Sequence, residues 1–210
     1  MLEFDFSKEP GRCLLNRNLQ YEGKPLVSII TPYYNAGKYF EQTFHSVMNQ
    51  TFPWFEWIIV DDGSSEEGSI DILKKFTGTD SRIKVIRQEN GGQSAARNAG
   101  IRNSTTDIIV PLDADDLIAP PFLEELYFAL QKNPQAAWAY TDSVGFGAQE
   151  YLWKQPFSVT RMKEENILVC TAAIRKEWLE KVGGYEVGNR AYDEDWHLWL
   201  RLLAAGAEPI

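Results

Sequence analysis

From residue 25 onward, short apolar segments alternate with segments whose apolar residues recur every three or four positions. The apolar segments have the length of strands and end at turn residues, which is typical of strands in a parallel sheet. The other segments are about 10 residues long, and their spacing predicts amphipathic helices. The predicted strands are 27–31, 57–60, 83–88, 107–112 and 137–140, and the predicted helices are 39–50, 70–76, 94–102, 121–132 and 193–205.

Residues that favour turns and helix ends set the boundaries of these elements. Pro32 is expected to end the first strand, because proline has no backbone N–H to give to a strand ladder. Ser69 is the expected N-cap of the helix over 70–76. The helix over 121–132 carries a proline and two glutamates in its first turn, and both residue types suit the start of a helix.

Strands that alternate with helices predict crossover units, and hence an α/β fold with a mainly parallel central sheet flanked by helices. Such crossovers are right-handed in about 98% of cases, which leaves little choice of topology. The pattern loosens after Ser143: 145–160 fits antiparallel strands or a loop over the sheet, 166–174 is expected to be extended, and 176–182 helical. We expect a leader over 1–24 and one domain over 25–210 that is truncated at its C-terminus, since the chain stops just past its last helix.

Composition and charge narrow the function classes. The chain has 210 residues, enough for one domain that buries roughly 70% of the surface of its unfolded chain. Its 21 Lys and Arg face 30 Asp and Glu, and the net charge of −9 argues against nucleic acid as a partner. Cys13 and Cys170 form neither a zinc pattern nor a disulfide framework. Without a signal peptide or an apolar run of roughly 20 residues, a cytoplasmic domain with no transmembrane segment is expected.

Three polar clusters follow predicted strands: Thr31-Pro32-Tyr33, 61–65 (DDGSS) and 113–116 (DADD). Ligands of open parallel sheets bind outside the carboxyl ends of the strands, where these clusters would meet. Each cluster alone has an ordinary interpretation as a turn or a solvated loop. Together, however, their aspartates would repel one another unless a cation or the donors of a ligand compensated them. Mg²⁺ and Mn²⁺ prefer such oxygen ligands.

Several familiar nucleotide and hydrolase motifs are missing. The sequence has no G-x-x-x-x-G-K-[ST] loop, no G-x-G-x-x-G after the first strand and no G-x-S-x-G elbow. These absences argue against P-loop phosphotransferases, dinucleotide-dependent oxidoreductases and serine hydrolases. What remains is an α/β domain that would hold a diphosphate through a metal ion.

Five motifs resemble those of the inverting nucleotide-sugar glycosyltransferases of family 2, in that family's order. They are VSIITPYYN, VDDGSS, GGQSAARNAGI, LDADD and GGY followed by EDWHLWLR. The resemblance covers about Pro25 to the end of the chain. It implies the GT-A fold, a single Rossmann-like α/β domain, with a donor-binding half over about 25–116 and an acceptor-side half over about 117–210.

The resemblance assigns donor-binding roles to residues at the strand ends. Asp62 would hydrogen-bond the pyrimidine ring, in a base pocket lined by Thr31, Pro32 and Tyr33. A carboxylate can accept the ring N–H of uracil or thymine, whereas cytosine offers an acceptor there, so UDP-sugars are favoured and TDP-sugars remain open. The glycines Gly91 and Gly92 would let the backbone approach the donor.

The resemblance also assigns the metal and the catalytic base. Asp115 would coordinate Mn²⁺ or Mg²⁺, and Asp113 would contact the ribose or the metal with its water. The role of Asp116 is open, and Arg97 would meet either a phosphate or an aspartate of the rim. Asp195 would be the general base that takes the proton of the acceptor hydroxyl, with Glu194 as a candidate assistant.

Aromatic and histidine residues outside these motifs have simpler interpretations. Trp196 and Trp199 share the apolar face of a helix and are predicted to lie in the core. Tyr151 and Trp153 are candidates for stacking on the acceptor. His45 and His197 have no partner at metal-ligand spacing and are expected at the surface.

The sequence thus predicts a metal-dependent inverting glycosyltransferase that moves a sugar from a nucleoside diphosphate sugar to a hydroxyl acceptor. The acceptor would be a glycan, a lipid-linked or another hydroxyl compound, in polysaccharide or glycoconjugate synthesis. Peripheral association with the inner face of the membrane is left open. The alternatives are a catalytically silent module that binds sugar nucleotides and a sugar-1-phosphate nucleotidyltransferase, although the segment after the first strand lacks the glycine-rich basic loop of the latter.

Overall fold

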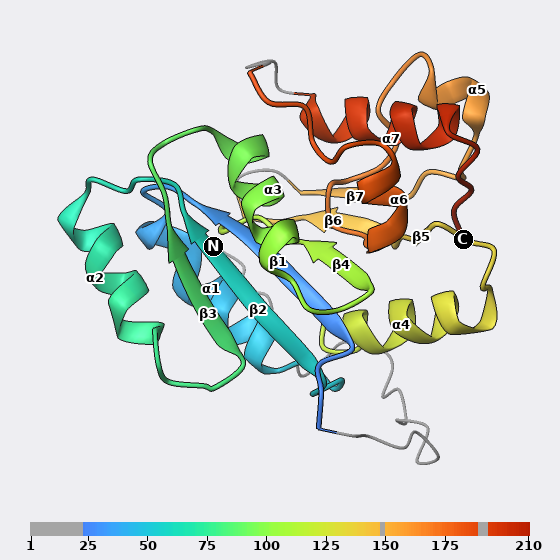
Figure 1. Cartoon of the computed structure of the whole chain (residues 1–210). Coiled ribbons are helices and arrows are strands. Elements are labelled where there is room, and N and C mark those ends of the chain that lie inside the picture. The colour runs from blue at the N-terminus through green and yellow to red at the C-terminus, as the bar shows by residue number, and fades with distance from the viewer. Residues whose placement is uncertain (1–22, 148–149, 189–192) are drawn as a thin grey trace.

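A six-stranded sheet with the order β3-β2-β1-β4-β8-β5 forms the centre of the computed structural model, which describes residues 23–147, 150–188 and 193–210 (Figure 1). The strands are β1 (Val27–Tyr33), β2 (Phe55–Asp61), β3 (Ile83–Arg87), β4 (Ile108–Pro111), β5 (Trp138–Ala139) and β8 (Ala173–Arg175). The first four pair in parallel, whereas β8 runs antiparallel between β4 and β5. The predicted α/β fold with a mainly parallel sheet is confirmed. The predicted leader lies almost entirely outside the described residues.

Helices cover both faces of the sheet. They are α1 (Gly37–Met48), α2 (Glu67–Phe76), α3 (Gln93–Asn103), α4 (Phe122–Lys132), α5 (Val159–Met162), α6 (Lys176–Lys181) and α7 (Glu194–Ala204). Ile29 belongs to the core under α1, α2 and α4, and its neighbour Ile30 belongs to the core under α3, α6 and α7. Because both faces are buried, the central strands are apolar throughout, which is why they stand out as apolar runs in the sequence.

The first strand continues through Pro32, contrary to the expectation that it ends there. The carbonyl of Tyr33 faces β2, since it accepts the backbone N–H of Asp62, whereas the carbonyl of Ile30 faces β4. Because successive residues face alternate neighbours, the missing N–H of Pro32 also points to the β4 side. The pairing between β1 and β4 has already ended at Ile30, so proline removes no ladder bond there. Beyond this point the two strands are no longer joined.

The predicted N-cap at Ser69 is wrong, because α2 begins before it. The Ser69 hydroxyl accepts the N–H of Gly37 and donates to Glu66. Two N–H groups at the start of α2, those of Ser65 and Glu66, donate instead to Oδ1 of Asn35. Asn35 has a φ of 50°, a left-handed conformation that asparagine tolerates better than most residues. A cap supplied from a distant loop leaves no local signal in the sequence.

The second half of the chain is less regular, as its pattern indicates. β6 (Ser143–Gly145) and β7 (Tyr151–Trp153) form a separate antiparallel hairpin. Within the expected extended segment 166–174, strand structure begins only at Ala173. Upstream of it, the Asn166 side chain accepts the N–H of Leu168, and such local bonds compete with strand pairing.

The C-terminal residues lie along β5, at the edge of the sheet. Ile210 donates its N–H to the carbonyl of Trp138, and Glu208 accepts the N–H of Ala137. A parallel bridge joins Trp138 to Pro209. Among the described helices, none combines the length and the apolar character needed to cross a membrane.

Candidate functional site

A cavity of about 410 Å³ opens at the carboxyl ends of β1, β2 and β4, where the bond ladder between β1 and β4 has ended. We call it the acidic cavity. Its lining comes from the end of β1, from the segments after β1, β2, β3 and β4, and from the start of α3: Pro32, Tyr33, Tyr34, Ala36, Asp62, Asn90, Gly92, Gln93, Asp113, Ala114 and Asp115. The polar clusters expected at this edge of the sheet therefore contribute residues to one cavity.

Asp62 is fixed at the wall of this cavity as a hydrogen-bond acceptor. Its side chain is buried, and Oδ1 accepts the N–H of Gly91 at 3.0 Å and Nε2 of Gln88 at 2.6 Å. Oδ2 accepts the N–H of Gly92 at 2.8 Å. A carboxylate offers about four lone-pair sites, so one site remains for a ligand. Gly91 and Gly92 thus hold the carboxylate, and Gly92 does so with a φ of 88° that favours glycine.

Tyr33, the last residue of β1, and Tyr34, which follows it, differ in exposure. The Tyr33 hydroxyl donates to the carbonyl of Ser69 at 2.6 Å, and burial raises the Tyr33 pKa to about 12. Thr31 also lies in the core, where it accepts the indole N–H of Trp57, and its side chain does not line the acidic cavity. Tyr34 lines the cavity as Tyr33 does, but it is 52% exposed. The exposed aromatic face at this wall is therefore that of Tyr34, which the sequence analysis missed.

Asp113 is the most heavily engaged of the acids that follow β4. Its Oδ1 accepts Arg97 Nη2 at 2.6 Å and Gln93 Nε2 at 3.0 Å, and its Oδ2 accepts the Cys170 thiol at 3.4 Å. Burial, with the charge of Asp113, raises the pKa of the Cys170 thiol well above its usual range, so the thiol stays protonated. Asp115 is exposed and accepts no hydrogen bond from a described residue.

Asp116 reveals that the acids of this segment are incompletely compensated. Desolvation by the surrounding protein atoms is the main effect that raises the pKa of Asp116 to about 6, and the negative charges of Asp113 and Asp115 add to it. The atoms of Asp113, Asp116 and Cys170 that could ligate a metal lie within 4.8 Å of one another, a group that does not include Asp115. Exposed carboxylate oxygens fit Mg²⁺ or Mn²⁺, whereas a protonated thiol suits neither ion. The acids of this segment, rather than Cys170, therefore fit the expected metal ion.

Arg97 of α3 joins the acidic cavity to α7. It is 1% exposed, and besides the bond to Asp113 its Nη1 donates to Glu194 at 2.7 Å. Burial alone would lower the pKa of Arg97, but the charges around it, chiefly that of Asp113, hold it above its ordinary value. Of the two roles open for Arg97, the structure displays the ion pair with an aspartate of the rim. Glu194 is likewise occupied, as the partner of Arg97.

Asp195 follows Glu194 in the first turn of α7 and is half-buried. Its Oδ2 accepts Asn166 Nδ2 at 3.1 Å, and its Oδ1 accepts the N–H of Trp196 at 2.8 Å. Burial raises the pKa of Asp195, although both hydrogen bonds act in the opposite direction. A carboxylate that is costly to keep ionised takes up a proton more readily, as a general base requires.

The remaining aromatic and histidine residues divide as follows. Trp199 is fully buried and stacks on Trp138 at 5.4 Å between ring centroids, as predicted for a core residue. Trp196 is partly buried, and its indole N–H donates to the carbonyl of Met162. Tyr151 is exposed on the hairpin, and Trp153 is partly buried. His45 is exposed, and the side chain of His197 is 39% exposed.

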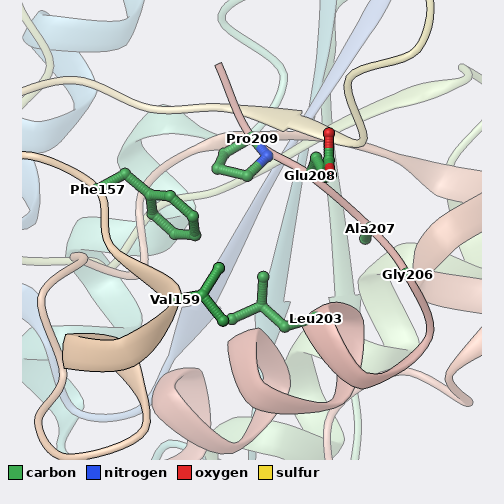
Figure 2. Close-up of a pocket in the computed structure, with 7 residues that line it drawn as sticks. All are labelled: Phe157, Val159, Leu203, Gly206, Ala207, Glu208 and Pro209. Carbon is green, nitrogen blue, oxygen red and sulfur yellow. The ribbon is translucent and has the colours of Figure 1, made fainter.

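A second cavity, of about 310 Å³, lies away from these acids. Phe157, Val159 and Leu203 form one side of it, and the C-terminal segment 206–209 forms the other (Figure 2). Its lining is mainly apolar, with Glu208 as its one acid. None of the predicted site residues lines this cavity.

The sequence and the fold both match known proteins. The sequence model of the glycosyl transferase family 2 matches residues 28–198. The chain is 35% identical over 193 residues to the putative teichuronic acid biosynthesis glycosyltransferase TuaG of Bacillus subtilis, with 87% of this chain and 74% of TuaG covered. It is 30% identical over 208 residues to the O-antigen biosynthesis protein RfbC of Myxococcus xanthus, with 95% of this chain and 16% of RfbC covered.

Solved structures share the fold at low sequence identity. S. aureus TarS 1–349 matches with a TM-score of 0.68 at 23% identity, covering 84% of this chain and 55% of that one. The mannosyltransferase PcManGT from Pyrobaculum calidifontis, in complex with GDP-Man and Mn²⁺, matches with a TM-score of 0.67 at 22% identity, covering 89% and 54%. The chain thus spans about half the length of these structures.

The sheet order, the acidic cavity at the strand ends and the shared architecture define a GT-A fold, as predicted. The family follows from the sequence matches. The chain belongs to glycosyl transferase family 2, and the prediction of a glycosyltransferase is confirmed at that level.

Proposed function

We propose that this chain carries the catalytic domain of a metal-dependent inverting glycosyltransferase, which moves a sugar from a nucleoside diphosphate sugar to a hydroxyl acceptor. One observation carries the proposal: a fixed acceptor, Asp62, and two acids that follow β4, Asp113 and Asp115, share one cavity. The first suits a nucleobase and the second suits a cation with its diphosphate. In this proposal residues 25–116 hold the donor, and residues 117–210 supply the base and the acceptor side.

The nucleobase is recognised by Asp62 and Tyr34. Three donors already bind the Asp62 carboxylate, and its remaining lone pair can only accept a hydrogen bond from the ligand. It therefore favours a base with a ring N–H, such as uracil or thymine, over cytosine. Guanine also carries a ring N–H, and PcManGT was solved with GDP-Man, whereas TarS was solved with UDP-GlcNAc. UDP-sugars remain our first choice of donor, with GDP-sugars as the competitor to test.

Asp115 and Asp113 would hold Mn²⁺ or Mg²⁺ together with the diphosphate, because their oxygens suit these ions and one or two carboxylates suffice when phosphates complete the shell. When bound, the ion would neutralise charge on the departing nucleoside diphosphate. The hydrogen bond from Arg97 holds the side chain of Asp113 in position. Asp115, which is exposed and accepts no hydrogen bond from a described residue, can turn toward the ion.

Asp195 would take the proton from the acceptor hydroxyl. In an inverting displacement the acceptor attacks the anomeric carbon opposite the diphosphate, so its proton goes to a carboxylate on that side. Asp195 is held by Asn166 and has a raised pKa because of burial, which suits proton uptake. Glu194 is less suited to this task, because its carboxylate is paired with Arg97.

The acceptor is proposed to be a hydroxyl of a cell-surface polysaccharide or of its precursor. TuaG and RfbC are named for teichuronic acid and O-antigen biosynthesis, which are both polymer pathways. Tyr151 and Trp153 of the hairpin remain the aromatic candidates for the acceptor side. Residence in the cytoplasm remains an expectation from the sequence, which leaves association with the inner face of the membrane open.

One set of incubations tests the proposal against its alternatives. The chain is incubated with UDP-, TDP-, GDP- and CMP-sugars, with Mn²⁺ or with a chelator, and free nucleotide is measured. Metal-dependent release of UDP supports the transferase. Turnover that requires pyrophosphate would identify a nucleotidyltransferase, and tight binding without release would identify a silent binding module.

A further inference from the structure

Arg97 occupies a buried position between two acids that come from distant parts of the chain. Its guanidinium bonds Asp113, after β4, at 2.6 Å and Glu194, in the first turn of α7, at 2.7 Å. It lies over the ring of Tyr185 at 5.1 Å. One positive charge is thus shared between two carboxylates, one at the proposed metal site and the other beside the proposed base.

Further contacts hold the segment before α7 against α3 and α7. Asn98, next to Arg97 on α3, donates to the carbonyl of Tyr185 at 2.7 Å and accepts its N–H at 2.8 Å. Gly184 has a φ of 72°, and a Cβ there would lie 2.4 Å from Asn98 Oδ1, so glycine permits this approach. Arg201 of α7 donates to the carbonyls of Val182 and Gly184. These contacts hold the segment before α7 in place. The two ion pairs of Arg97 then connect the first turn of α7 to Asp113, an acid of the proposed metal site.

A cation bound at Asp113 would change how strongly Arg97 is attracted to each of its two partners, Asp113 and Glu194. A divalent ion offsets the negative charge of Asp113, so the pull of that carboxylate on Arg97 weakens. Glu194 then becomes the main partner of the guanidinium. Burial makes this redistribution matter, because charges in a poorly solvated position are weakly screened.

We propose that Arg97 is a positioning residue that couples cation occupancy at Asp113 to the placement of the first turn of α7, and so of Asp195. The proposal rests on the metal assignment of the proposed function. Coupling of this kind is reciprocal: a fixed α7 would also favour binding of the cation with its nucleotide. Arginine suits the role better than lysine, because its planar fork can bind two carboxylates at once.

Hydrogen–deuterium exchange tests this coupling without any acceptor and without turnover. Amide exchange in the first turn of α7 is measured for the whole chain alone, with UDP, and with UDP and Mn²⁺. Binding is followed in parallel by calorimetry. We expect UDP with Mn²⁺ to slow exchange there about fivefold, the lower end of typical coupling between sites. UDP with a chelator should leave it unchanged.

The decisive variant is Glu194→Gln, which keeps the shape and removes the charge that Arg97 would follow. It should still bind UDP and Mn²⁺ but lose the slowing of exchange in α7. Glu177→Gln is the matched control, because Glu177 is an exposed first-turn glutamate of α6. It should behave as the unchanged chain does. If Glu194→Gln does not fold, Arg97→Lys tests the coupling instead. In this variant, UDP and Mn²⁺ should slow amide exchange in the first turn of α7 less than in the unchanged chain.

The outcomes separate the coupling from the function on which it rests. If UDP and Mn²⁺ bind but α7 exchange does not respond, or if Glu194→Gln still responds in full, the coupling is wrong and the donor assignment survives. If UDP and Mn²⁺ do not bind at all, the proposed function fails and the coupling fails with it.

Discussion

The two halves of the molecule present different kinds of surface. Residues 25–116 contain the long parallel strands, and their proposed donor contacts are fixed from behind, as Asp62 is by its three donors. Residues 117–210 contain short strands and a hairpin whose apolar side chains face solvent, with Tyr151 53% and Leu152 64% exposed. A fixed site suits a ligand part that never varies, such as a nucleotide. A sparsely held surface leaves room for acceptors to differ.

The two cavities show the same contrast. The acidic cavity is lined by residues that follow strands, and the rigid sheet sets their positions. The cavity in Figure 2 is formed by Phe157 and Val159, from an irregular segment, and by the end of the chain after α7. The proposed contacts to the donor and the metal ion therefore lie at the first cavity, where the geometry is fixed.

The largest expected effect lies in the half over 117–210, at Asp195. Asp195→Asn should lower sugar transfer by about 10² to 10⁴, because the acceptor proton loses its base, while UDP affinity stays the same. Transfer is measured with the true acceptor, and affinity by calorimetry. Near-normal transfer in this variant would show that Asp195 is not the base and would pass the role to a neighbouring acid.

Asp115→Asn tests the metal in the donor half. An amide oxygen is a poorer ligand for Mn²⁺ than a carboxylate, so the Mn²⁺-dependent part of UDP binding should disappear. Calorimetry with Mn²⁺ and with a chelator separates that part from the rest. Asp71→Asn, an exposed acid on α2, is the control and should bind as the unchanged chain does. Equal Mn²⁺ dependence in the Asp115 variant would contradict the assignment.

Asp62 should set the choice of base. An acceptor that faces another acceptor costs about 1–3 kcal/mol, so the chain should bind UDP about one to two orders of magnitude more tightly than CDP. Asp62→Asn should reduce that preference. Competition between the nucleotides measures it, with GDP as a third ligand. Equal affinities for UDP and CDP in the unchanged chain would disprove this role.

Tyr34 should contribute a smaller, less selective part of donor binding. Removing an aromatic platform costs about 1–3 kcal/mol per stacked base, and the half-exposed ring of Tyr34 is expected near the lower limit. Tyr34→Ala should therefore weaken UDP and CDP about tenfold each. Tyr39→Ala, another exposed tyrosine nearby in the sequence, should leave both affinities unchanged.

The smallest effect concerns stability. Burial raises the folded-state pKa of Asp195 above its unfolded value, so its ionised form opposes folding at neutral pH. That cost declines as the pH falls through the folded-state pKa and is gone below the unfolded value. Asp195→Asn should therefore melt at a slightly higher temperature than the unchanged chain at pH 7, with the difference shrinking at acid pH. A lower melting temperature at pH 7 would contradict this.

The sequence predicts the donor half well because its signals are local. Apolar runs mark strands buried on both faces, and the polar residues that end them must meet at one edge of a parallel sheet. The two wrong expectations, at Pro32 and Ser69, have causes that lie far away in the sequence. Pro32 stays in β1 because the pairing with β4 stops beside it, and Ser69 is no cap because Asn35 serves α2 from another loop.

The difference between local and distant causes also explains which features of the candidate site could be predicted from the sequence. Tyr33 and Tyr34 both line the cavity, but which of them presents an exposed ring depends on how the chain leaves β1, and the sequence does not show this. The thiol of Cys170 beside Asp113 and the bridge from Arg97 to Glu194 join segments far apart in the sequence. Asp62 could be recognised from its motif, but the three donors that bind it could not.

The pairing of the C-terminal residues with β5 also bears on how the molecule avoids aggregation. A bare edge strand offers free N–H and C=O groups to any passing chain. At one edge of this sheet, the bonds from Ile210 and Glu208 occupy those groups. At the other edge, β3 carries Lys84 and Arg87, whose charges discourage strand addition. Without the hydrogen bonds to Glu208 and Ile210, β5 would offer free N–H and C=O groups to another chain, although the residues of the acidic cavity would stay in place.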